Sequence, residues 1–182
     1  MKKQIRKNVF ETNSSTSHTL TLRYCDDNNE TNLIPRNSVF EFSNYLYIEN
    51  KLGNADYETI HIATEQDKLA VCMALCLNMY ENETKTYYFN YNDLAKEEGK
   101  TLNEYLKDKP YFKELYQVIK DVCDTELVIE SICNLDSLND DMAFEPLIDD
   151  CKCHLDETAN FYDFIRHVIF SEYEIIDEVV PM

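Results

Sequence analysis

The chain is poor in glycine, proline and tryptophan. Its 182 residues include two Gly, four Pro and no Trp. Because Gly53 and Gly99 lie far apart, there is no glycine-rich loop of the kind that wraps a phosphate group, and nucleotide sites of that class are excluded. A chain of this length can bury a core of its own. Its apolar content of 44% is too high for a disordered acidic protein.

Long hydrophobic runs are also absent. No stretch reaches the roughly 18 apolar residues of a membrane-spanning helix, and the start Met1-Lys2-Lys3-Gln4 is not followed by an apolar segment. The sequence therefore predicts no membrane association and a cytoplasmic location. In that compartment the seven Cys are expected to be reduced thiols, and their odd number argues against a complete disulfide framework.

Basic residues are scarce, and the acidic ones are concentrated near one end. The chain has 17 Lys and Arg against 35 Asp and Glu, a net charge of −18. Residues 121–182 hold 17 of the acids and only Lys152 and Arg166 as bases, whereas the first ten residues carry four bases and no acid. Phosphates would be repelled, so no direct nucleic-acid binding is expected. A basic partner, bound cations or solubility alone could account for the excess of acid.

The hydrophobic pattern predicts an α+β fold in a single domain over residues 1–182. Strands are expected at residues 3–10, 19–24, 38–42 with 45–48, 59–62, 127–129 and 173–180. A helix is expected from Thr64, with Asp67 at capping-box spacing and one apolar stripe along it. Asn92 is expected to cap a second helix, and further helices are expected over residues 101–107, 110–122 and 161–169. This order gives N-terminal antiparallel strands, central helices and a C-terminal helix–strand unit.

Residues 134–157 form the longest candidate loop, acidic and irregular apart from Met142 to Leu147. The segment places carboxylates between apolar residues such as Leu138 and Phe144. Such a surface could mimic the phosphates of a nucleic acid and engage Arg and Lys of a DNA-binding groove through charge-assisted hydrogen bonds. The candidate partner contacts are Asp136, Asp140, Asp141, Glu145, Asp149, Asp150 and Asp156.

A cluster of metal-ligating residue types lies in the same segment. Cys151, Cys153 and His154 could bind zinc, with Cys133 or Cys123 as a fourth ligand. The Cys-x-Cys spacing is atypical for such sites, and two half-buried thiols in a loop is the competing interpretation. A zinc-binding interaction module is therefore the alternative function. Otherwise no cofactor is expected.

A serine and histidine pair near the N-terminus does not predict an enzyme. Ser14 and Ser15 precede His18, but a nucleophile and its base need hydrogen-bond geometry and an orienting group, which sequence neighbours rarely achieve. A turn in which Asn and Ser side chains bond the backbone is the favoured interpretation. We therefore expect a protein without catalytic activity.

A distinctive run of residues lies near the N-terminus: Phe10, Glu11, Thr12, Asn13, Ser14, Ser15 and His18, with Thr16 between them. This run resembles a signature of small phage and mobile-element proteins of gut bacteria, in which a third Ser is common at the position of Thr16. Residues 161–170 are similar to the C-terminal helix of that family, and the two segments together cover under a fifth of the chain.

Within this family, an acidic member of this length resembles the type II-A anti-CRISPR proteins. That resemblance implies an inhibitor in the cytoplasm of the bacterial host. Its expected partner is the type II RNA-guided nuclease with its guide RNA, whose positive channel the acidic surface would engage. The signature assigns no contact residues.

Overall fold

The computed structural model describes residues 16–24, 32–45, 59–85, 90–133 and 142–181. Along the chain these residues form β1 (Thr16–Tyr24), β2 (Val39–Ser43), β3 (Ile60–Ile62), α2 (Glu65–Thr84), α3 (Tyr91–Glu97), α4 (Leu102–Lys107), α5 (Phe112–Cys123), β4 (Glu126–Ser131), β5 (Met142–Ala143), α6 (Glu145–His154), α7 (Phe161–Phe170) and β6 (Tyr173–Pro181). The predicted α+β class, with its central helices and C-terminal helix–strand unit, is confirmed.

A four-stranded sheet joins the two ends of the described chain. Its strand order is β3-β6-β1-β5. β6 runs antiparallel to β1, from Thr16 opposite Pro181 to Tyr24 opposite Tyr173, and also antiparallel to β3. The N-terminal strands β1 and β3 thus both pair with the C-terminal strand β6. The short β5 runs parallel to β1.

A separate two-stranded sheet consists of β2 and β4 in parallel. Asn44 continues this ladder past the end of β2: its side chain accepts from the Cys133 backbone N–H at 2.9 Å and donates to the Cys133 carbonyl at 3.0 Å. On the other side of β4, the Asn103 side chain of α4 accepts from the Ile129 N–H at 3.0 Å. Side-chain amides thus take up backbone groups that neighbouring strands would otherwise pair.

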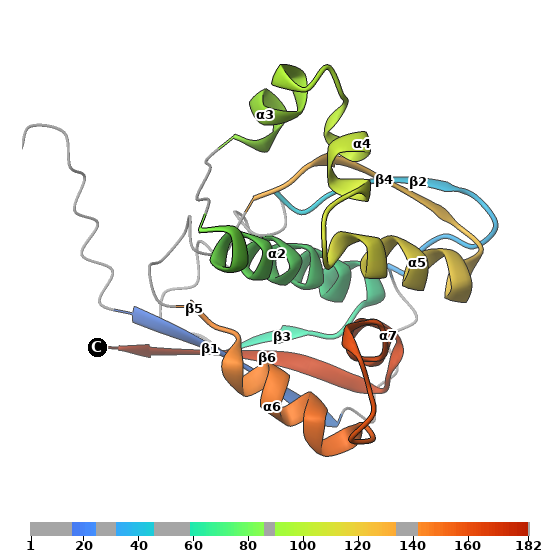
Figure 1. The fold of residues 1–182 in the computed structure, drawn as a ribbon. Helices are drawn as coiled ribbons and strands as arrows, with labels where there is room; N and C mark the ends of the chain where they lie inside the picture. Colours follow the sequence, from blue (N-terminus) through green and yellow to red (C-terminus); the bar gives the residue numbers. More distant parts are fainter. Residues whose placement is uncertain (1–15, 25–31, 46–58, 86–89, 134–141, 182) are drawn as a thin grey trace, which may run out of the picture.

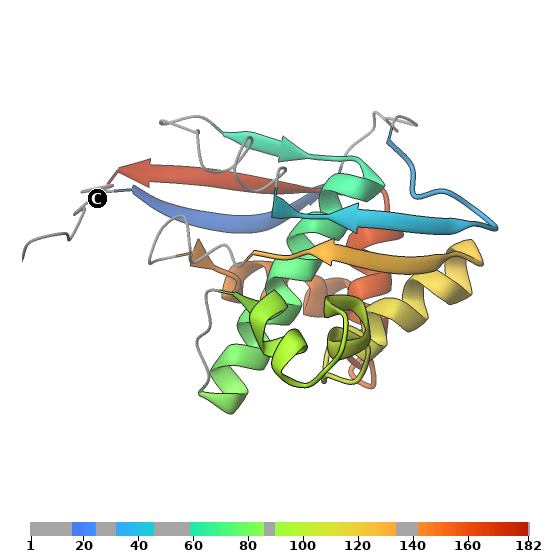
Figure 2. The ribbon, with the colours of Figure 1, turned by 90° about the horizontal axis from the view of Figure 1, so that it is seen from above.

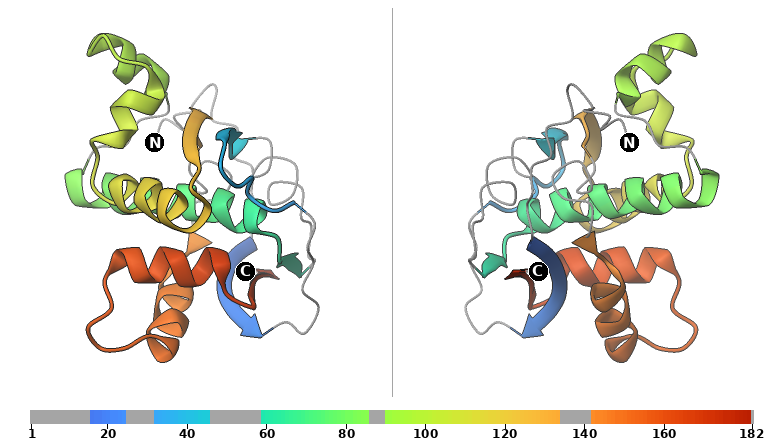
Figure 3. Two further views of the ribbon diagram at one scale, coloured as in Figure 1. Left: turned by 90° about the vertical axis from the view of Figure 1, so that its right-hand side faces the viewer. Right: turned by 90° about the vertical axis from the view of Figure 1, so that its left-hand side faces the viewer.

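The helix α2 lies between the two sheets (Figure 1, and the side views of Figure 3). Every residue from Asp67 to Leu77 is buried, so this part of the helix is covered all round and not along one stripe as predicted. It packs against α5 and α7. A helix enclosed on all sides is expected to be apolar on all faces, which Ala70, Val71 and Leu75 supply on the faces outside the predicted stripe.

Polar residues cap three of the helices, and Thr64 is the one among them that the sequence predicted as a cap. Thr64 caps α2, Thr101 forms a full capping box at α4, and Asn160 forms another at α7. Each satisfies backbone N–H groups that the first helical turn leaves without a partner. The helix α3 is capped by Asn90, so the expectation that Asn92 caps it was wrong.

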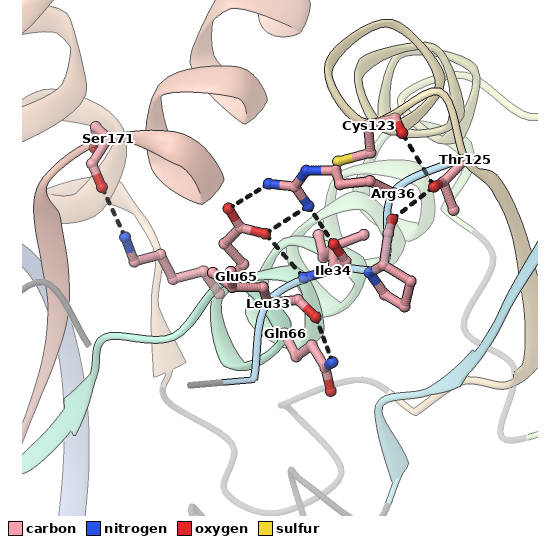
Figure 4. A network of polar contacts seen from close by, with 10 residues as sticks. Leu33, Ile34, Arg36, Glu65, Gln66, Cys123, Thr125 and Ser171 are labelled. Atoms are coloured by element: carbon pink, nitrogen blue, oxygen red, sulfur yellow. Dashed lines mark hydrogen bonds and ion pairs between the residues drawn. The ribbon is translucent and has the colours of Figure 1, made fainter. Parts of the chain in front are cut away.

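A polar clamp fixes the segment before β2 to the rest of the fold (Figure 4). The Arg36 guanidinium pairs with the Glu65 carboxylate at 2.8 Å, and this hydrogen bond raises the pKa of Arg36. The same guanidinium lies 5.7 Å from the ring centroid of Phe170 in α7. The Thr125 hydroxyl, next to β4, donates to the Pro35 carbonyl at 2.6 Å. One short segment therefore connects α2, α7 and β4.

The acidic stretch at 134–157 is more regular than expected. Residues 134–141 lie outside the described residues, but 142–143 form β5 and 145–154 form α6. Seen from above, α6 and α7 lie beyond the edge of the four-stranded sheet that β1 and β5 form, away from β3 (Figure 2). The prediction of a long irregular loop was therefore wrong for the helix, and the acids of this stretch are presented on a fixed element.

Candidate protein-binding surface

The helix α6 forms because its apolar residues pack on the body of the protein. Pro146 stands in its first turn, where a missing N–H costs nothing. Leu147 and Cys151 are fully buried, and Ile148 is half-buried beside them. Cys151 lies three positions after Ile148 and four after Leu147, so the three residues share one side of the helix. The opposite side carries Asp149 and Lys152 into solvent.

The candidate contact residues of this helix have different roles. Asp150 is half-buried, and its carboxylate accepts a hydrogen bond from the backbone N–H of Leu22 in β1 at 2.9 Å. It therefore attaches α6 to the sheet. Asp149 is exposed and pairs with Lys152 at 2.9 Å, an ion pair that costs little to break.

Only some of the predicted partner contacts fall within the residues that the structure describes. Asp156 is exposed just after α6. Glu145 is the first residue of α6, whereas Asp136, Asp140 and Asp141 lie outside the described residues. Asp149 and Asp156 are thus the two predicted contacts that the structure places in solvent.

A groove opens where α6 turns into α7, lined by residues of α6, α7, their connecting loop and α2. We call it the α6–α7 groove, and its volume is about 540 Å³. Apolar side chains from three helices and the connecting loop form its floor: Met79, Ile148, Leu155, Ala159, Phe161 and Phe164. The polar residues that line it are Lys152, Asp156, Glu157 and Asn160. The groove is an apolar hollow with a charged rim.

The rim is acidic. Asp156 and Glu157 are both exposed, and Lys152 is the only base among the described lining residues. The charge of Lys152 is already matched by Asp149. The remaining carboxylates therefore set a negative potential at the mouth of the groove. The sequence identified Asp156 as a candidate contact but not Glu157, and it did not reveal the groove, because the groove joins Met79 of α2 to residues about 70–85 positions later.

The three proposed zinc ligands do not converge. Residues two apart on a helix point about 200° from each other, and Cys151 is buried while Cys153 is exposed. Burial, followed by the nearby Asp150 charge, raises the pKa of Cys151 to about 12, which disfavours the thiolate that a metal needs. Among the residues that the structure describes, no three His, Cys, Asp or Glu side chains are placed to hold a metal ion. The geometry gives the zinc interpretation no support.

His154 belongs to a different group, which the sequence did not reveal. Its ring lies 4.6 Å from that of Tyr173 and 5.8 Å from that of His167, measured between centroids. Burial lowers the pKa of His167, and the neighbouring His154 and Lys68 lower it further. The three rings come from α6, α7 and β6, so no local spacing connects them.

The signature residues are only partly placed. His18 lies in β1, opposite Val179 of β6 and Met142 of β5. Phe10, Glu11, Thr12, Asn13, Ser14 and Ser15 lie outside the described residues. A pairing of Ser14 or Ser15 with His18 therefore stays untested.

Comparisons with known proteins returned no relatives. No protein-family model, no curated protein and no solved structure matches the chain. In the described ranges no helix combines the length and the apolar character needed to cross a membrane.

Proposed function

We propose that the protein is a phage- or mobile-element-encoded inhibitor of a type II RNA-guided nuclease, acting by binding and without catalysis. The observation that carries the proposal is the pair of exposed carboxylates, Asp156 and Glu157, beside an apolar groove at the turn from α6 to α7. Protein-binding surfaces commonly combine an apolar centre with a polar rim. An acidic rim selects a basic partner surface.

The choice of partner rests on charge and on the N-terminal resemblance. The nuclease has a positive channel for its guide–target heteroduplex and Arg residues that read the short motif beside the target. Exposed carboxylates such as Asp149 and Asp156 can form charge-assisted hydrogen bonds with those Arg residues. The signature from Phe10 to His18 resembles that of a phage and mobile-element family. Because of this resemblance, we select the nuclease from among the possible basic partners.

The structure changes which residues should be tested. Asp150 supports the fold through Leu22, so reversing its charge would confuse loss of folding with loss of binding. The informative reversal is Asp149→Lys with Asp156→Lys. A matched control is Glu97→Lys with Glu130→Lys, because both of these acids are exposed and lie on α3 and β4, away from the groove.

The first experiment is a pull-down of the purified nuclease–guide complex at about 50 mM and about 500 mM NaCl, since exposed charges are screened at the higher concentration. We expect a complex at low salt that weakens at high salt and that the Asp149/Asp156 double variant reduces far more than the control. Competition with target DNA then separates a block of DNA binding from a block of cleavage. Absence of a complex at low salt, or equal losses for both double variants, would contradict the proposal.

A further inference from the structure

We propose that the α6–α7 groove binds a basic partner segment that carries a large apolar side chain. The apolar side chain would occupy the floor, and Lys or Arg residues beside it would pair with Asp156 and Glu157. For the identity of the partner the inference rests on the proposed function. For the chemistry of the segment it rests on the groove alone.

The floor of the groove is held in place by contacts within the fold. The Phe161 ring lies 5.0 Å from that of Tyr111 in an edge arrangement and 5.7 Å from that of Phe164 in a stacked one. The capping box of Asn160 and Asp163 fixes the first turn of α7, which carries Phe161 and Phe164. A preformed apolar hollow costs little to organise on binding, which favours an anchoring side chain.

One side of the floor can adapt to its occupant. Met79 lines the groove from α2 and is only partly buried. A flexible thioether side chain adjusts to different apolar shapes. The floor is therefore suited to Leu, Met or Phe as the anchor, and the choice among them is expected to affect binding only modestly.

The rim decides the charge of the occupant. The Lys152 charge is matched by Asp149 at 2.9 Å, which leaves the Asp156 and Glu157 carboxylates exposed at the mouth. Nucleic acids, acidic peptides and anionic lipid surfaces would be repelled there. A segment with Lys or Arg next to its anchor satisfies both the floor and the rim, in the manner of an amphipathic peptide in a groove.

The first ten residues of this chain have the same chemistry. Lys2, Lys3, Arg6 and Lys7 alternate there with Ile5, Val9 and Phe10. A groove filled by this segment, from the same copy or from a second one, would be a different result, and the experiment separates it from partner binding.

The test uses three fluorescent peptides of about 12 residues, in the pattern of a groove-binding helix. One combines Lys with Leu, one replaces the Leu residues with Ser, and one replaces the Lys residues with Glu. Fluorescence anisotropy measures their binding to the full chain. We expect the Lys–Leu probe to bind at least about tenfold more tightly than either of the others.

Variants of the groove locate the binding. Ile148→Ser should weaken the Lys–Leu probe about tenfold, and Asp156→Lys with Glu157→Lys by a similar factor. The controls are Ile132→Ser, a half-buried isoleucine outside the groove, and Glu97→Lys with Glu130→Lys. These control variants should bind the Lys–Leu probe with an affinity within about twofold of that of the parent chain. Circular dichroism and thermal melting confirm that each variant is folded.

Three outcomes overturn the inference. Equal binding of the Ser probe would show that the floor is not used, and equal losses in the control variants would show attraction to net charge alone. Tighter probe binding after Ile5, Val9 and Phe10 are all changed to Ser, which leaves the net charge unaltered, would show that the chain's own N-terminal segment occupies the groove.

The nuclease pull-down separates the two proposals. Groove-dependent peptide binding without nuclease binding would retain this inference and remove the proposed function. If Ile148→Ser leaves nuclease binding unchanged, the proposed function is retained and this inference is removed.

Discussion

At the scale of single residues, similar side chains in this protein have different roles. Asp149 and Asp150 are neighbours, yet one is exposed and the other accepts a backbone hydrogen bond from β1. Cys151 and Cys153 differ in the same way. The sequence identified all four as candidates but could not assign these roles, because each role depends on how α6 is rotated against the sheet.

The pH dependence of stability is expected to contain a contribution from His167. Burial lowers its pKa in the folded state below the ordinary 6.5, while the unfolded chain keeps the ordinary value. As the pH falls, the unfolded state therefore binds the proton before the folded state does. The contribution of His167 to the free energy of unfolding is present in full above about pH 6.5 and is lost as the pH falls below that value. His167→Phe should reduce this loss.

Urea unfolding at about pH 7.5 and pH 5 measures the effect as the difference between the parent chain and the variant. This comparison removes the contribution of the many carboxylates, which both chains share. A parent and a variant that lose the same stability between the two pH values would contradict the prediction.

At the scale of elements, local signals located most helices and failed where packing decides. Thr64 marked the start of α2 correctly, because a cap is a local interaction. For α3 the useful signal was the spacing of Asn90 from Asp93, which Asn92 lacks. The parallel pairing of β2 with β4 joins segments almost 90 residues apart and leaves no local signal.

The helix α6 was missed because its pattern is short. A helix of ten residues has little stability alone and depends on tertiary contacts. Leu147 and Cys151 supply those contacts on the buried side. The groove beside α6 could not be predicted for the same reason, since it exists only once α6, α7 and α2 are assembled.

The attachment of α6 to β1 gives a prediction at this scale. Asp150→Ala should lower the free energy of unfolding by about 1–3 kcal/mol, because the Leu22 N–H would lose its acceptor in a partly buried place. Asp149→Ala should cost about 1 kcal/mol or less, since its ion pair with Lys152 is exposed. Urea denaturation of both variants measures the contrast. Equal small losses would show that Asp150 does not hold the helix to the strand.

At the scale of the whole molecule, the net charge of −18 works against compactness. Added NaCl screens this repulsion over distances of about 10 Å at 0.1 M and less at higher concentrations. We therefore expect the thermal midpoint to rise between about 20 mM and about 500 mM NaCl. The thermal midpoint of the less acidic double variant, Glu97→Lys with Glu130→Lys, should rise by less. A midpoint that is unchanged or falls in the parent chain would show that attractive ion pairs outweigh the repulsion.

The position of β6 constrains the order in which the molecule can form during synthesis. This strand follows every other described element along the chain, yet it lies between β1 and β3 in the finished sheet. β1 and β3 therefore leave the ribosome long before the strand that joins them. A pairing between residues this far apart requires the closure of a very long loop, which slows folding. The four-stranded sheet, with the groove beside it, is thus expected to form only after residues 173–181 have been made.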